Sequence, residues 1–243
     1  MIVGMMLGKS LRLRRIFANG RALIVDCGPL AGDRLGKVRQ LARAGTDAVV
    51  LTPGLLGMVA EELAGLSVIL RIDGGLRRVQ QLLSVQSTLE MGAEAVLVSV
   101  EAPGPELSED LERFGRVTDE ARHLGMPVIA EVSGQAWIEV ARLAAEYGAD
   151  VIQARFVPEL VTDRHFVRIT GRPLLVSLGE ELPAMPGLLD TIYDLVQGAA
   201  QGVVLRDRAL AEPSVLRAIH GLVHQGISAG EALDIMHSPE RAL

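Results

Sequence analysis

Short apolar runs alternate along the chain with longer amphipathic segments, and this alternation repeats eight times. The short runs are rich in Val, Ile and Leu, as expected for strands of a parallel sheet that is covered on both faces. Between them, apolar residues recur at helical spacing, for example in Asp110–Gly125 and Ala136–Gly148. The eight expected strands lie within Arg21–Asp26, Ala44–Leu51, Ser67–Asp73, Met91–Val100, Pro127–Val132, Tyr147–Ala154, Pro173–Ser177 and Gly198–Leu205.

A repeated phrase marks several junctions between a helix and the next strand: a helix end, a glycine, a small or acidic residue and a β-branched run. It occurs at Gly45, Gly92 and Gly148, and again within Gly198–Leu205. Glycine at such a junction ends a helix in the left-handed conformation. Most connections between strands are therefore predicted to be helices, and Thr52–Leu66 has the weakest helical pattern among them.

This order of elements predicts the fold. Strand–helix alternation repeated eight times is typical of a single-domain (β/α)8 TIM barrel. An open, doubly wound α/β sheet is the alternative, but it would need a Gly-rich phosphate loop after the first strand, and Val25–Asp33 matches that motif poorly. No composition break marks a second domain, so we expect residues 1–20 to pack as an N-terminal segment on a barrel formed by residues 21–243.

Composition narrows the class of protein. The chain is 49% hydrophobic but only 3% aromatic, so its core must be built from Ala, Val, Leu and Ile. The net charge is −6 and no Lys/Arg-rich block with aromatic residues occurs, which argues against a nucleic-acid partner. One cysteine excludes an intramolecular disulfide, and no apolar run approaches the roughly 18 residues of a membrane span. We expect a cytoplasmic protein that binds no membrane.

Four segments carry a resemblance to a known family. They are Gly8–Asp26, Leu124–Val132, Tyr147–Ile152 and the tail that begins at Gly198. In order and spacing they resemble the archaeal-type class I fructose-bisphosphate aldolases, a DeoC/LacD-like family that includes the aminodideoxyheptulosonate synthases. The resemblance implies a TIM barrel, a lyase or transferase acting on a sugar-phosphate-like carbonyl compound, no cofactor, and assembly as a homo-oligomer.

The family's functional positions can be compared residue by residue. Its Asp-His-Gly after the first strand is similar to Asp26–Gly28, where Cys replaces His. Its proton-transferring Tyr on the fifth strand aligns with Ser133, and its Schiff-base Lys on the sixth strand aligns with Gln153. Its phosphate-binding Gly-Gly and Gly-Arg pairs correspond to Leu178–Gly179 and Arg206–Asp207.

The change at Gln153 affects the mechanism that the resemblance implies. A Schiff base requires an amine that can lose its proton and attack a carbonyl, whereas an amide nitrogen is not nucleophilic. The chain has two lysines, Lys9 before the barrel and Lys37 in the first expected helix, and neither lies at a strand end. We therefore expect a divergent active site that does not use a lysine Schiff base.

Charged and polar side chains gather at the expected carboxyl ends of the strands, where functional residues of a barrel cluster. In the family register these positions face the barrel interior, so their charges must be paired, hydrated or bound to a ligand. The catalytic candidates are Asp26, Glu131 and Gln153. The substrate-binding candidates are Arg71, Asp73, Glu101, Ser133, Arg155, Ser177, Gly179 and Arg206.

Three interpretations of this mouth stay open. In the first, Asp26 or Glu131 is a general base, and Arg155 and Arg206 hold a small anionic metabolite, because guanidinium groups suit carboxylate and phosphate. In the second, some of the carboxylates bind a divalent cation that polarises a carbonyl. No His accompanies them, so no metal ligands are assigned. In the third, the charges form an internal network in a catalytically silent barrel with a structural or regulatory role.

Two further features favour ordinary packing over chemistry. Cys27 follows Asp26, but strand alternation turns it to the other side, so a packed thiol is expected rather than a nucleophile. His220 and His224 are four residues apart on the last expected helix, a spacing that can hold a metal ion. No third ligand is evident, and we expect this pair to be solvated or at a subunit interface.

Overall fold

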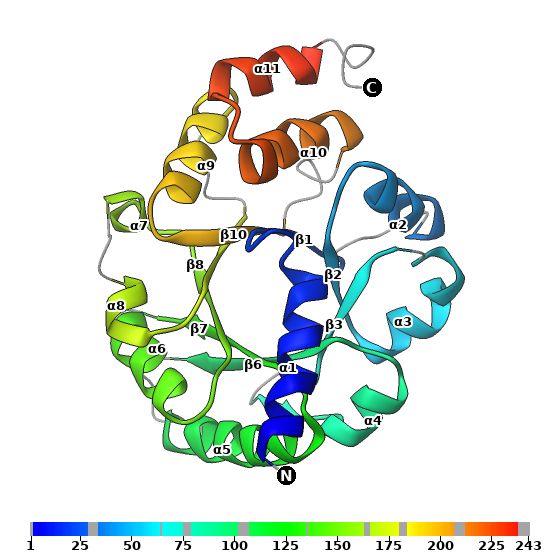
Figure 1. Cartoon of the computed structure of the whole chain (residues 1–243), viewed down its shortest axis with the longest axis vertical. Coiled ribbons are helices and arrows are strands. Elements are labelled where there is room, and N and C mark those ends of the chain that lie inside the picture. Colours follow the sequence, from blue (N-terminus) through cyan, green and yellow to red (C-terminus); the bar gives the residue numbers. More distant parts are fainter. Residues whose placement is uncertain are drawn as a thin grey trace.

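Eight parallel strands close into a barrel in the computed structural model of the chain, and helices surround it (Figure 1). The structure describes residues 2–28, 34–63, 65–74, 79–101, 107–134, 136–162, 166–179, 184–206 and 212–237. The predicted single-domain TIM barrel is confirmed. Its strands, in their order around the barrel, are β1 (Ala22–Asp26), β10 (Ala200–Leu205), β9 (Leu174–Leu178), β8 (Val151–Arg155), β7 (Val128–Ser133), β6 (Ala95–Glu101), β3 (Ser67–Arg71) and β2 (Ala48–Leu51).

Helices follow the strands, as the sequence pattern predicts. Within Thr52–Leu66, whose pattern is weakest, Pro53–Val59 forms a helix: Pro53 occupies the first turn, and the Thr52 side chain accepts a hydrogen bond from the Leu55 amide. The helices are α1 (Ile2–Ile16), α2 (Arg34–Arg43), α3 (Pro53–Val59) with the 3₁₀ turn η1 (Ala60–Glu62), α4 (Val85–Glu90), α5 (Leu107–Leu124), α6 (Trp137–Glu146), α7 (Glu159–Thr162), α8 (Phe166–Thr170), α9 (Gly187–Gln197), α10 (Pro213–His220) with the π turn η3 (Gly221–Gln225), and α11 (Ala229–His237).

Glycine ends three of these connections as expected. Gly45, Gly92 and Gly148 have positive φ angles of 84°, 81° and 111°, a region that residues with a Cβ rarely adopt. Each lies two residues beyond the last helical residue and three before the following strand, so these glycines fix the point at which the chain turns back into the barrel.

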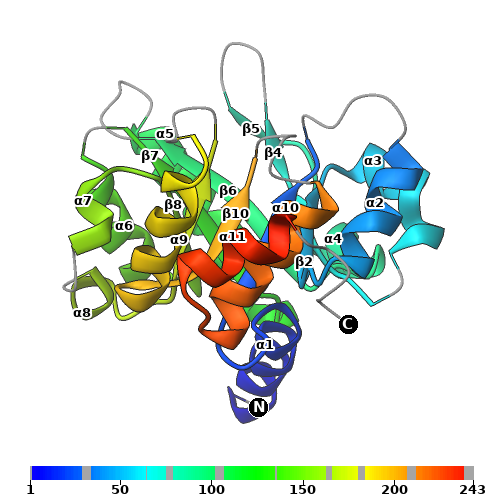
Figure 2. The same ribbon diagram turned by 90° about the horizontal axis from the view of Figure 1, so that it is seen from above.

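One expected strand is shorter than the sequence pattern suggests. The barrel strand β3 ends at Arg71, and the chain then leaves the barrel as β4 (Asp73–Gly74), which pairs antiparallel with β5 (Gln80–Gln81). Asp73 therefore lies on this two-stranded ribbon and not on the same strand as Arg71. The ribbon rises at one end of the barrel, opposite α1 (Figure 2).

Alternate residues of the strands form the interior of the barrel below the mouth. Together with Ile16 of α1 they make one buried apolar cluster, against which Leu13 and Phe17 pack. Helix α1 thus closes the amino-terminal end of the barrel (Figure 2), and Lys9 binds Asp150 there at 2.7 Å. The strand members of the cluster are Ala22, Ile24, Ala48, Val50, Ile69, Ala95, Leu97, Ile129, Val151, Leu175 and Val204.

The outward-facing residues of the strands pack under the helices in a second and larger apolar cluster. Among the described residues, no helix is long and apolar enough to cross a membrane.

Gly202 of β10 packs closely against Ala22 of β1, so a substitution at Gly202 tests the register of these two strands. A Cβ atom at Gly202 would lie 2.2 Å from the Ala22 carbonyl oxygen, which is main chain and cannot turn away. We expect Gly202→Ala to lower the free energy of unfolding in urea by about 2 kcal/mol or more. The matched control is Gly57→Ala, in a helix with no heavy atom within 4 Å of the new Cβ, which should be neutral or stabilising. Equal effects of the two changes would contradict the register.

Candidate active site at the barrel mouth

Four side chains converge on the carboxylate of Glu131, which lies on β7. Arg71 Nη1 donates to Oε2 at 2.6 Å, and Arg206 Nη1 donates to Oε1 at 3.0 Å. Gln153 Nε2 donates to Oε1 at 3.0 Å, and the Ser99 hydroxyl lies 3.3 Å from Oε2. These partners come from β3, β8, β6 and the residue after β10, so Glu131 connects distant parts of the barrel wall.

A second carboxylate, Asp26 at the end of β1, shares both guanidinium groups. Its Oδ2 atom lies 3.4 Å from Arg71 Nη2 and 3.4 Å from Arg206 Nε, while Oδ1 accepts a hydrogen bond from the Gly28 amide at 3.0 Å. Two arginines thus bridge two carboxylates, and the four charges cancel. Asp26 and Arg71 are more enclosed than Arg206, whose side chain is 38% exposed.

The surroundings of Glu131 favour its ionised form. Burial on its own acts to raise the pKa of Glu131, but the hydrogen bond and charge of Arg71, the charge of Arg206 and the hydrogen bond from Ser99 outweigh it, and the pKa is lowered. Because both carboxylate oxygens already accept hydrogen bonds, Glu131 is a weak proton acceptor in this arrangement.

Asp73 lies beside this network rather than at its centre. Its Oδ2 atom accepts the Ser99 amide at 2.7 Å and lies 3.5 Å from Arg113 Nη2. Burial raises the pKa of Asp73 and is only partly offset by the Ser99 hydrogen bond and the charges of Arg113 and Arg71. Asp73 therefore anchors the end of β6 from the ribbon, and this role follows from its position outside the barrel strand.

Arg113 of α5 is a buried participant that the sequence pattern does not reveal. It donates to Asp110 at 2.7 Å, to the Val79 carbonyl at 3.0 Å and to the Ser99 carbonyl at 2.5 Å. On an amphipathic helix a charged residue is ordinarily read as solvent-facing. The sequence feature that could have indicated its burial is the spacing of Asp110 and Arg113, three residues apart at the edge of the apolar face.

The remaining candidates line the rim of the mouth. Glu101 and Arg155 are exposed, and Arg155 makes no hydrogen bond or ion pair with any described residue. Ser133 and Gly179 are half-buried. Ser177 is buried beside Arg155 in the β8–β9 register, and its hydroxyl has no hydrogen-bond partner in the described part of the chain.

The scaffold around this mouth matches a known aldolase family over most of its length. A sequence model of the DeoC/LacD family aldolases matches residues 32–205. The chain belongs to this family. An uncharacterised aldolase of Saccharolobus solfataricus is 26% identical, over 95% of this chain and 100% of that protein. A 2-amino-3,7-dideoxy-D-threo-hept-6-ulosonate synthase of Archaeoglobus fulgidus is 26% identical, over 94% of this chain and 96% of its own.

Solved structures support the fold of this aldolase-family chain. An archaeal fructose 1,6-bisphosphate aldolase superimposes with a TM-score of 0.77 at 20% identity, covering 90% of this chain and 100% of its own. A fructose-bisphosphate aldolase from Slackia heliotrinireducens gives a TM-score of 0.79 at 14% identity, covering 96% of this chain and 91% of that one. At these identities the similarity establishes the barrel architecture.

Within the aldolase scaffold Gln153 lies on β8, beside Glu131 in the β7–β8 register. It is 1% exposed and its amide nitrogen faces Glu131. Neither lysine of the sequence is placed near it by the described contacts: Lys9 is paired with Asp150 at the end that α1 closes, and Lys37 lies on α2, with its side chain outside the described atoms.

Both histidines have partners within the fold, so the expectation of a solvated pair is wrong. His224 Nε2 is 2.8 Å from Asp47 Oδ2, and His220 Nδ1 is 2.9 Å from the Gly45 carbonyl. Asp47 also accepts the Leu23 amide at 2.6 Å. The pair braces the C-terminal helices against the start of the barrel. Among the described residues, no three His, Cys, Asp or Glu side chains are grouped closely enough to hold a metal ion.

The loss of stability at acidic pH should depend on the ion pairs of Glu131. Folding lowers the pKa of Glu131. The ionised carboxylate therefore adds to the free energy of unfolding above the unfolded-state pKa, and this contribution is lost as pH falls through the folded-state value. We expect Glu131→Gln to reduce the free energy of unfolding by about 3 kcal/mol at neutral pH, and the gap to the parent protein to narrow below about pH 4. Urea titrations from neutral to acidic pH measure this gap.

The control for that measurement is Glu112→Gln, which breaks an exposed pair with Arg116 and should change stability by less than about 1 kcal/mol. A gap for Glu131→Gln that stays constant across the acidic range would contradict the assigned ion pairs.

Cys27 is packed in the outer apolar cluster, which confirms the expected packed thiol. Burial, helped by the nearby charge of Asp26, raises the pKa of the Cys27 thiol to about 12. We expect no reaction with a disulfide reagent such as DTNB in the native protein at neutral pH, and one full equivalent after unfolding in urea. Rapid labelling of the native protein at the same rate as of the unfolded chain would show that Cys27 is accessible.

Proposed function

We propose that this chain binds a small anionic carbonyl compound at the barrel mouth and acts on it, as a divergent lyase or transferase of the aldolase lineage, without a lysine Schiff base. The observation that carries the proposal is the combination at the mouth: a buried amide at Gln153 and two guanidinium groups, Arg155 and Arg206, that face solvent. The names of the relatives concern sugar bisphosphates and a heptulosonate, which are anionic carbonyl compounds.

Arg155 and Arg206 would hold the anionic group. Arg155 has no partner among the described residues, and the exposed part of Arg206 can form further hydrogen bonds beyond those to Asp26 and Glu131. The unpartnered Ser177 hydroxyl lies next to Arg155 in the sheet and would donate to the same group. Guanidinium forks bind carboxylate and phosphate in two-pronged geometry, which supports an anion at this rim.

Asp26 is the better placed of the two candidate bases. Glu131 is saturated with hydrogen bonds and its pKa is lowered, whereas the contacts of Asp26 to the arginines are longer. In the proposed reaction Asp26 removes a proton next to the substrate carbonyl. Glu131 and Gln153 hold Arg71 and Arg206 in place, and Glu101, Ser133 and Gly179 shape the rim.

A second candidate function is a catalytically silent barrel with a structural or regulatory role. The closed charge balance around Glu131 favours it, because Asp26, Arg71, Glu131 and Arg206 satisfy one another without a ligand. The two candidates differ in whether a small anion binds and in whether its protons exchange.

Binding is tested with dihydroxyacetone phosphate, pyruvate and inorganic phosphate by calorimetry. We expect at least one of the two carbonyl compounds to bind, and Arg206→Ala and Arg155→Ala each to weaken it by about tenfold or more, since hydrogen bonds to charged groups are lost. Arg142→Ala, which removes an exposed arginine of α6, is the matched control and should have no effect. Failure of all three anions to bind would favour the silent barrel.

Chemistry is tested by proton exchange and by trapping. In D₂O, NMR should show loss of the protons next to the carbonyl of the bound compound, and Asp26→Asn should abolish this loss. Borohydride treatment followed by mass spectrometry should give no covalent adduct. An adduct on Lys9 or Lys37 would overturn the proposed mechanism, and binding without exchange would leave the chain a binding protein.

A further inference from the structure

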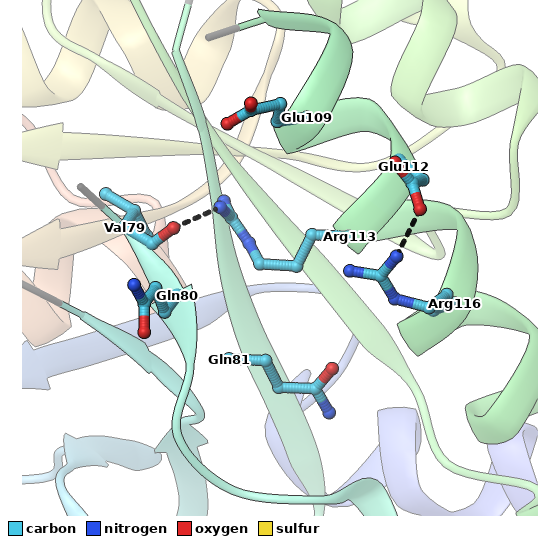
Figure 3. Close-up of a pocket in the computed structure, with 7 residues that line it drawn as sticks. All are labelled: Val79, Gln80, Gln81, Glu109, Glu112, Arg113 and Arg116. Atoms are coloured by element: carbon cyan, nitrogen blue, oxygen red, sulfur yellow. Dashed lines mark hydrogen bonds and ion pairs between the residues drawn. The ribbon is translucent and has the colours of Figure 1, made fainter.

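A pocket of about 430 Å³ lies beside the mouth, between the β4–β5 ribbon and the first half of α5 (Figure 3). One wall is Val79–Gln81, and the other is formed by Glu109, Glu112, Arg113 and Arg116 of α5. The helix residues are spaced three, four and seven positions apart, so they share one face of α5. Its size is within the range of pockets that bind small molecules.

Arg113 forms the inner end of this pocket, and its charge is compensated within the fold. Figure 3 shows its side chain extending from α5 towards Val79, whose carbonyl accepts from Nη1 at 3.0 Å. Asp110 at 2.7 Å and Asp73 at 3.5 Å balance the positive charge. The Nε atom is buried, with no hydrogen-bond partner in the described part of the chain, and it is not exposed to the pocket.

The outer part of the pocket carries a positive and a negative side chain, and each can exchange its present partner for a ligand. Arg116 binds Glu112 at 2.5 Å, but the two side chains are 62% and 72% exposed, so this helix pair is weak and a ligand can replace either partner. Across the pocket, Gln81 donates through Nε2 to the Leu83 carbonyl, which leaves its amide oxygen as an acceptor. The Gln80 side chain is exposed and makes no hydrogen bond with a described residue.

We propose that this pocket binds a small zwitterion of the α-amino acid class. A ligand ammonium group would bind Glu112 and the Gln81 amide oxygen, and its carboxylate would bind Arg116. A plain anion would meet the carboxylates of Glu109 and Glu112, and a plain cation would meet Arg116, whereas a zwitterion can pair with both signs of charge. The site is separate from the mouth and does not depend on the function proposed there, since Arg206 and Arg155 take no part in it.

The test is a calorimetric or NMR titration of the full chain with each of the common amino acids. We expect saturable binding of at least one, weakened about tenfold or more by Arg116→Gln and by Glu112→Gln. The matched controls are Arg142→Gln and Glu146→Gln, which break an equally short pair of similar exposure on α6 and should leave the affinity unchanged. Both pairs are exposed, so folding is not at risk, and circular dichroism verifies it.

Three results of these titrations would overturn the proposal. They are no binding of any amino acid up to about 10 mM, binding that Arg116→Gln and Glu112→Gln do not weaken, and binding of acetate or methylamine as tight as that of the amino acid. Arg206→Ala locates the ligand: unchanged amino-acid affinity supports the α5 pocket, whereas its loss would place the ligand in the mouth and refute this site. A mouth that binds no carbonyl compound would leave the result at α5 unaffected.

Discussion

Compensation of the Glu131 charge is the constraint on which the mouth depends. A carboxylate this enclosed costs free energy unless donors surround it, and removal of one partner leaves the others uncompensated. Arg71 reaches it from β3 and Arg206 from the end of β10, so the carboxylate joins strands on separate sides of the barrel. The same two arginines also bind Asp26. The position of each charged group is therefore set by the others.

The amide at Gln153 fits this balance in a way that an amine would not. It donates to Glu131 at 3.0 Å without adding charge to a group of two carboxylates and two guanidiniums. A lysine at the same place would bring a third cation within reach of Glu131. The neutral amide at Gln153 and the closed charge network are thus physically consistent, because Arg71 and Arg206 already neutralise both acids.

Strand alternation predicted much of the fold and the meeting of Asp26, Arg71, Glu131, Gln153 and Arg206, because side chains two residues apart share a face. What it could not predict are contacts made outside the strands. Asp73 was the last residue of the expected strand Ser67–Asp73, yet the chain leaves the barrel before it. Arg113 and His224 find partners distant in sequence, Asp73 and Asp47. Such pairings depend on how helices are placed around the barrel, which periodicity does not encode.

Helix α1 determines from which end a small molecule can enter and leave the barrel. Because Ile16 sits in the innermost apolar layer, with Leu13 and Phe17 packed against it, the barrel is a well with a floor rather than a passage. A compound that enters past Arg155 and Arg206 must depart through the same opening. One molecule therefore cannot enter while the previous one is leaving. Both pass the same rim residues.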